Sequence, residues 1–185
     1  MLAAEPRAWL AAMRALVCDL SLPRQAVAAV LGAIDKRFYF GPYSPAQLRD
    51  IPEPELPAED WVVIRTSLCG ICGSDYKQMF LNGSLDNPMT AIISFPQVLG
   101  HEVVGRIVRV GPTVTSRRVG QRVVLNPWLS CGPRGITPPC PACRDGQYSI
   151  CHNFARGVLP PGIHTGNSSK ATGGFAPLVP AHESM

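Results

Sequence analysis

The fold is decided by the stretch HEVVGRIVRVGPTV at residues 101–114. Its branched side chains favour an extended chain, Gly105 would break a helix, and Gly111-Pro112 is typical of a turn. The segment after that turn, GQRVVLNP at 120–127, has the character of a second strand. We therefore expect these two strands to pair.

Extended segments are also expected on either side of this pair. They are MRALVCDL from Met13, WVVIRTSL at 61–68, and a last strand in PLVPAHESM after Gly173-Gly174-Phe175-Ala176. The proline-rich stretch at 51–60 predicts an extended connector, and residues 23–37 predict a short surface helix that Gly32 weakens. The absence of β-α-β alternation predicts a mainly β chain, that is, a β-rich α+β fold with short helices.

Composition limits the kind of protein. Hydrophobic residues make up 46% and charged residues 16% of the chain, which predicts one main folded domain. The net charge of +4 comes from scattered basic residues, so no nucleic-acid partner is expected. Charged residues interrupt every apolar run and the N-terminus lacks a secretory pattern, so we expect no membrane partner and a cytoplasmic location. Residues 1–12 are Ala-rich, and either they form an ordered extension or the true start is Met13.

Four of the seven cysteines occur in CGPRGITPPCPACRDGQYSIC, with spacing Cys131-x8-Cys140-x2-Cys143-x7-Cys151. Four thiolates can surround zinc tetrahedrally and leave no open position, which is typical of a structural site. A loop this poor in aliphatic residues needs metal binding to order it. The alternatives are reduced thiols or two disulfides, and His152 could replace one ligand.

A second group of polar residues lies in LCGICGSDYK (68–77) and LGHEVVG (99–105). Cysteine and histidine ligands in incomplete number are typical of a catalytic zinc, which keeps a position for water or substrate. Each segment alone is a weak signal. Cys69 and Cys72 could instead form a redox pair, and the His-Glu pair could simply lie on the surface.

Together, in this order, the motifs GICGSD, GHE, NPxxxCG, CPAC-x7-C and GGFA resemble the zinc-containing medium-chain dehydrogenases, the alcohol and polyol dehydrogenase family. The resemblance covers roughly residues 45–185 and implies a GroES-like, partly open β-barrel with a zinc-stapled loop lobe at 126–153. The implied plan is an N-terminal extension, first strand and helical insertion at 1–45, followed by the GroES-like domain at 46–185.

The resemblance also implies roles for single residues. Cys72 and His101 would bind the catalytic zinc, with Glu102 close to the metal as an indirect or transient ligand. Ser74 would pass the substrate proton outward, and Asp75 would orient the zinc-bound histidine. The implied reaction is hydride transfer between a small alcohol or carbonyl substrate and NAD or NADP.

Several features depart from the family pattern. Lys77 stands where several members have a relay histidine, the gap between Cys131 and Cys140 is longer than usual, and both it and the insertion after the first strand are expected to alter surface loops. No two glycines have the G-x-G spacing of a dinucleotide-binding fingerprint, so we expect no Rossmann domain within this chain. The third catalytic ligand is likewise expected elsewhere, and the isolated chain is expected to be a truncated or split form, inactive alone.

Two hypotheses follow. The first is the zinc-binding catalytic domain of an alcohol dehydrogenase-like oxidoreductase, which could form a homo-oligomer or pair with a separate Rossmann-domain chain. The second is a non-enzymatic zinc-binding β module. A disulfide oxidoreductase using Cys69 and Cys72 is a distant third, because that role prefers a C-x-x-C that opens a helix in a β-α-β setting.

Overall fold

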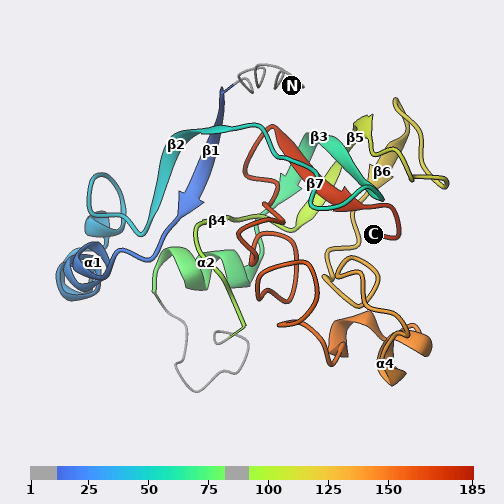
Figure 1. Cartoon of the computed structure of the whole chain (residues 1–185). Coiled ribbons are helices and arrows are strands. Elements are labelled where there is room, and N and C mark those ends of the chain that lie inside the picture. Colours follow the sequence, from blue (N-terminus) through green and yellow to red (C-terminus); the bar gives the residue numbers. More distant parts are fainter. Residues whose placement is uncertain (1–11, 82–91) are drawn as a thin grey trace, which may run out of the picture.

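A computed structural model describes residues 12–81 and 92–185 of the chain. Its strands form two open sheets, and the helices are short (Figure 1). The expected mainly β, partly open architecture is therefore confirmed. Among the described helices, none is long and apolar enough to cross a membrane.

The larger sheet has the strand order β6-β5-β3-β7. It contains β3 (Trp61–Gly70), β5 (Glu102–Val110), β6 (Arg122–Val124) and β7 (Leu178–His182), all paired antiparallel. The predicted pairing of the 101–114 and 120–127 strands is confirmed in β5 and β6. Burial of apolar side chains stabilises this sheet; the buried cluster consists of Val62, Ile64, Val103, Ile107, Leu125, Val179 and Ala181.

The smaller sheet has the order β2-β1-β4. β1 (Ala12–Cys18) pairs with β2 (Ala46–Pro52) along seven residues and with the short β4 (Gln97–Val98) on its other side. The connector expected at 51–60 is therefore shorter, because β2 takes up its first two residues. The boundary that we expected after residue 45 lies between two paired strands and stays a prediction, and residues 1–11 lie outside the described part.

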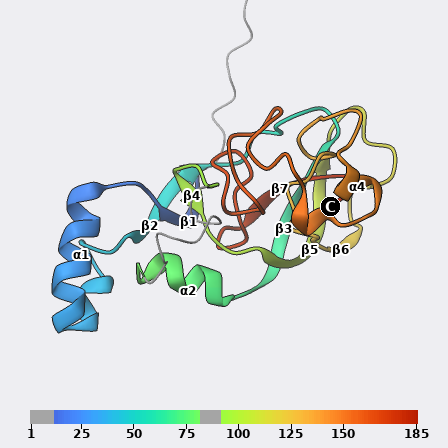
Figure 2. The same cartoon turned by 90° about the horizontal axis from the view of Figure 1, so that it is seen from below.

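Two of the helices lie toward the ends of the molecule, and another packs against residues of the smaller sheet. α1 (Leu22–Ile34) and the lobe helix α4 (Pro141–Arg144) sit at opposite ends of the molecule, with α2 (Gly73–Met79) between them (Figures 1 and 2). The predicted helix at 23–37 ends earlier, because Asp35 is extended and its carboxylate accepts a hydrogen bond from Arg37 N–H, which starts the 3-10 turn η1 (Lys36–Tyr39). Gly32 is where the helix meets Tyr39: an added Cβ would lie 2.5 Å from that ring.

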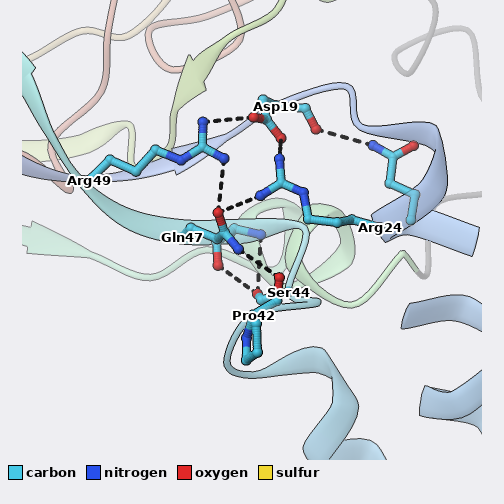
Figure 3. Close-up of polar contacts among 8 residues, drawn as sticks. Asp19, Arg24, Pro42, Ser44, Gln47 and Arg49 are labelled. Carbon is cyan, nitrogen blue, oxygen red and sulfur yellow. Dashed lines mark hydrogen bonds and ion pairs between the residues drawn. The ribbon is translucent and has the colours of Figure 1, made fainter. Parts of the chain in front are cut away.

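A polar cluster joins α1 to the smaller sheet (Figure 3). Asp19, just after β1, forms ion pairs with Arg24 of α1 and with Arg49 of β2, the latter at 2.7 Å. Gln47 Oε1 accepts hydrogen bonds from both guanidinium groups. Burial alone would raise the pKa of Asp19, but the two arginines outweigh it and hold the pKa below its usual value. One carboxylate therefore fixes the inserted helix to both strands.

We predict that Asp19→Asn lowers the free energy of unfolding by about 1 kcal/mol at neutral pH, because the groups are partly exposed and water screens them. The contribution is present above the unfolded-state pKa of about 3.9 and is lost as pH falls through the lower folded-state value. Denaturant unfolding at pH 7 and pH 3 measures it. Asp50→Asn, which breaks the exposed Arg14–Asp50 pair, is the control and should change stability much less; equal effects would contradict the account.

Candidate metal centres

The four cysteines of the lobe converge in the folded chain. Cys131, Cys140, Cys143 and Cys151 are buried, and their sulfur atoms all lie within 4.8 Å of one another. The Sγ atom of Cys151 lies 3.7 Å from that of Cys131 and 4.0 Å from that of Cys140. A tetrahedron with metal–sulfur bonds of about 2.3 Å has edges of about 3.8 Å, so the spacing fits one ion. No disulfide joins any of the seven cysteines in the described part of the chain, and the spacing of the four sulfurs favours one ion over the two-disulfide alternative.

Backbone and amide N–H groups point at these sulfurs. Cys140 N–H and Asn153 Nδ2 donate to Cys131 Sγ, and Asn153 N–H donates to Cys151 Sγ. Such donors stabilise thiolate over thiol. The pKa of Cys140 is lowered to about 6, first by a backbone N–H of His152, whereas burial raises the pKa of Cys151. His152 itself is exposed, and the metal-ligand cluster does not include it.

Apolar residues from the 131–151 loop and from its flanks cover the cysteines. Phe154 and Ile163 are buried against them together with Ala142, and Trp128 and Ile136 pack partly buried at the edge. Because Phe154, Ile163 and Trp128 lie outside the loop, the loop's own few apolar side chains are not the whole of its core. The lobe therefore has a small core, but four of its seven buried members are the cysteines themselves.

The second group also comes together. One ligand atom from each of Cys72, His101 and Glu102 lies within 4.8 Å of the others. Cys72 is the N-cap of α2, and Ser74, first through its backbone N–H and then through its hydroxyl, lowers the pKa of the Cys72 thiol. Glu102 pairs with Gly70 across β3 and β5, and a Cβ on Gly70 would lie 2.1 Å from Glu102 Oε2. Only glycine at position 70 leaves room for the carboxylate as it stands.

Asp75 lies beneath this group, with 1% of its surface exposed. Its carboxylate accepts hydrogen bonds from Cys72 N–H at 2.9 Å and Gly100 N–H at 3.1 Å, and Oδ1 lies 3.6 Å from His101 Nδ1. The last distance is too long for a direct hydrogen bond but close enough for charge attraction. Burial alone would raise the pKa of Asp75, yet these neighbours lower it. Asp75 thus links the two sequence motifs.

Two further side chains complete the neighbourhood. The Ser74 hydroxyl is buried beside Cys72, where it helps to lower the pKa of the thiol, but it makes no well-aligned hydrogen bond to any described residue. The Lys77 side chain is exposed. An orphaned buried hydroxyl next to three metal-type donors fits a site that takes up a polar ligand. Three protein donors leave a fourth position open on a tetrahedral ion.

His164 was missed by the sequence reasoning. Its ring centroid lies 4.2 Å from that of His101, and its Nδ1 donates to the carbonyl of Thr165 at 2.8 Å. Because a carbonyl only accepts, this bond fixes the neutral tautomer with a lone pair on Nε2. Burial lowers the pKa of His164 to about 4. No motif surrounds this histidine, so only its place in the fold reveals it.

For the lobe, we predict that Cys143→Ser lowers the melting temperature in zinc-containing buffer by more than 5 °C, because one tetrahedral position loses its thiolate. Cys18→Ser, a buried cysteine of β1 outside the lobe, is the control. Thermal unfolding with and without a strong chelator measures the effect. The chelator should destabilise the parent chain and the Cys18 variant, and should leave the Cys143 variant little changed; a chelator effect of equal size in all three would contradict the prediction.

Comparisons with known proteins point to one family. The family model of the alcohol dehydrogenase GroES-like domain matches residues 58–185. A probable diacetyl reductase [(R)-acetoin forming] of Saccharomyces cerevisiae is 34% identical over 160 residues, which is 79% of this chain and 36% of that protein. Sorbitol dehydrogenase of Bacillus subtilis is 34% identical over 115 residues, or 62% of this chain and 30% of that one.

Solved structures agree with this assignment. Galactitol-1-phosphate dehydrogenase from Escherichia coli superposes with a TM-score of 0.57 at 25% identity, covering 92% of this chain and 36% of that one. A cobalt- and zinc-bound alcohol dehydrogenase from Pyrobaculum aerophilum shares the fold, with a TM-score of 0.61 at 20% identity over 93% of this chain and 40% of that one. The chain spans about a third of the length of the curated relatives it matches. It belongs to the alcohol dehydrogenase GroES-like domain family of the zinc-containing medium-chain dehydrogenases.

Proposed function

We propose that this chain is the zinc-binding catalytic domain of an alcohol or polyol dehydrogenase. The observation that carries the proposal is the convergence of Cys72, His101 and Glu102 beside the unpartnered hydroxyl of Ser74. The relatives' names, which include a sorbitol dehydrogenase and an (R,R)-butanediol dehydrogenase, support a small alcohol or the matching carbonyl compound as substrate. The lobe cysteines would hold a second, structural zinc.

Each residue of the site has a task in this proposal. Cys72 and His101 bind a zinc ion, and Glu102 binds it directly or through the ligand in the open position. Bound zinc polarises a carbonyl or acidifies an alcohol. Ser74 accepts the proton that leaves the alcohol and passes it outward, and Asp75 holds the His101 ring and the start of α2 in place through the Cys72 and Gly100 amides. Because Lys77 is exposed where a relay histidine is common in the family, the outer proton step would pass to water.

The hydride acceptor is NAD or NADP. It would be held by a Rossmann domain, either further along the same polypeptide or in a separate chain, and a homo-oligomer is compatible with this. A cytoplasmic location agrees with the proposal, since reducing compartments keep cysteines available for metal. The alternative function, a zinc-binding β module without catalysis, predicts a single metal ion per chain.

The function is tested by metal content and by ligand binding. We predict two zinc ions per chain, and one in His101→Ala, because an imidazole ligand of the second site is gone. In the cobalt(II)-substituted chain, 3-mercapto-1,2-propanediol, a thiol analogue of a small polyol, should change the visible d–d bands by entering the open position. His152→Ala, an exposed histidine beside the lobe, is the control and should keep both responses. A content of one zinc ion per chain, together with d–d bands that do not change when the thiol is added, would favour the non-enzymatic module.

A finer prediction concerns Glu102. Gly70→Ala should weaken the second zinc by about tenfold, because the new methyl group displaces the Glu102 carboxylate. Gly73→Ala is the matched control, since a Cβ there meets nothing within 4 Å. Competition with a chromophoric chelator measures both dissociation constants. Equal affinities in the two variants would show that the carboxylate has no part in holding the ion.

A further inference from the structure

Arg134 is a buried positive charge without an acidic partner. It lies in the spacer between Cys131 and Cys140 and has 0% of its surface exposed. Its guanidinium group donates only to main-chain carbonyls; the acceptors and distances are Leu129 O at 2.8 Å, Arg156 O at 2.8 Å, Leu159 O at 3.1 Å, Pro160 O at 3.3 Å and Gly162 O at 2.6 Å. Among the described residues, no carboxylate lies within ion-pair distance of it.

Carbonyl oxygens satisfy the N–H groups but do not neutralise the charge. Removing a full charge from water costs several kcal/mol unless an opposite charge lies near. Burial lowers the pKa of Arg134 to about 10, which still leaves the group protonated at neutral pH. The groups whose negative charge acts favourably on it are the sulfurs of Cys151 and Cys131. With no described carboxylate at ion-pair distance, the cysteine cluster, which begins three residues before Arg134, is the negative group of the lobe that acts on this charge.

Metal binding would keep the four cysteines deprotonated, so the cluster as a whole would carry a permanent negative charge. Four thiolates around one divalent ion carry a net charge of about −2, whereas four neutral thiols carry none. We propose that Arg134 is the buried counter-charge of the metal-bound cysteine cluster, stabilising the four thiolates and being stabilised by them. This inference rests on the proposed lobe metal. It assigns Arg134 as a positioning residue of the metal site and not as a ligand.

The same residue ties the metal site to its surroundings. The five carbonyls come from residue 129 before the cluster and from 156–162 after it. The Arg134 side chain therefore links the segments on both sides of the lobe by hydrogen bonds. Its main chain is also held, because Val158 N–H donates to Arg134 O and a Cβ on Gly157 would lie 2.2 Å from that oxygen. The long Cys131–Cys140 spacer, which we expected to alter a surface loop, also carries a fully buried charge into the lobe.

The test compares charge with packing. All variants are made in His101→Ala, so that only the lobe binds cobalt(II) or zinc. Arg134→Met removes the charge, Arg134→Lys keeps it but loses most of the carbonyl contacts, and Arg144→Met removes an exposed charge of the same lobe. The readouts are the energy of the sulfur-to-cobalt charge-transfer band and the zinc dissociation constant. A nearby positive charge lowers the energy of the sulfur lone pairs, so losing it should shift the band to longer wavelength.

We expect Arg134→Met to shift the band to longer wavelength and to weaken zinc binding by at least about tenfold. Arg134→Lys should keep the band position even if the lobe is less stable, and Arg144→Met should change neither readout. An unchanged band in Arg134→Met, or an equal shift in Arg144→Met, would overturn the inference. If Arg134→Met does not fold, a shifted band in Arg134→Lys overturns it and an unshifted one supports it. A parent chain without any charge-transfer band would instead refute the proposed lobe metal.

Discussion

The rest of the structure depends on a close backbone contact between residues 98–100 and 173–175. Gly173 N–H donates to Val98 O at 2.7 Å, Phe175 N–H to Leu99 O at 2.9 Å, and Gly174 N–H to Gly100 O at 2.7 Å. A Cβ on Gly173 would lie 2.2 Å from Gly100 O, so only glycine allows this approach. The contact fixes the chain immediately before His101. Because Gly100 N–H also binds Asp75, the same contact sets the distance between the histidine and α2, where Cys72 lies.

The two candidate metal centres differ in how exposed their donor atoms are and in which polar groups lie next to them. Around Cys72, His101 and Glu102 the donors are partly exposed, a carboxylate lies behind the histidine, and one buried hydroxyl has no partner. Such a centre can exchange a ligand. In the lobe the four sulfurs are buried and N–H groups donate to them, and four sulfurs around one ion would leave no position open. Such a centre holds chain segments together and has no means of binding a substrate.

Much of the fold could be predicted from the sequence because it depends on local pattern. Branched residues around Gly105 gave β5 and its pairing with β6, and the spacing of the lobe cysteines identified their cluster. What could not be predicted depends on contacts between distant segments. Ring packing places His164 against His101, and the burial that lowers the pKa of His164 cannot be seen in the sequence GIHTG at 162–166. Arg134 looked like an ordinary loop arginine, since its five acceptors are main-chain atoms that carry no sequence signal. The end of α1 at Ile34 was likewise hidden, because Asp35 caps the following turn and ends the helix.

The central claim is that one chain holds two zinc ions of different ligand type. The most direct measurement is X-ray absorption at the zinc edge of the purified chain loaded with zinc. The account predicts a mixed average shell, with five sulfur ligands shared between two ions at about 2.3 Å and nitrogen or oxygen ligands at about 2.0 to 2.2 Å. A shell of four sulfurs per zinc, with no nitrogen or oxygen contribution, would contradict it, because the group at Cys72, His101 and Glu102 would then hold no zinc.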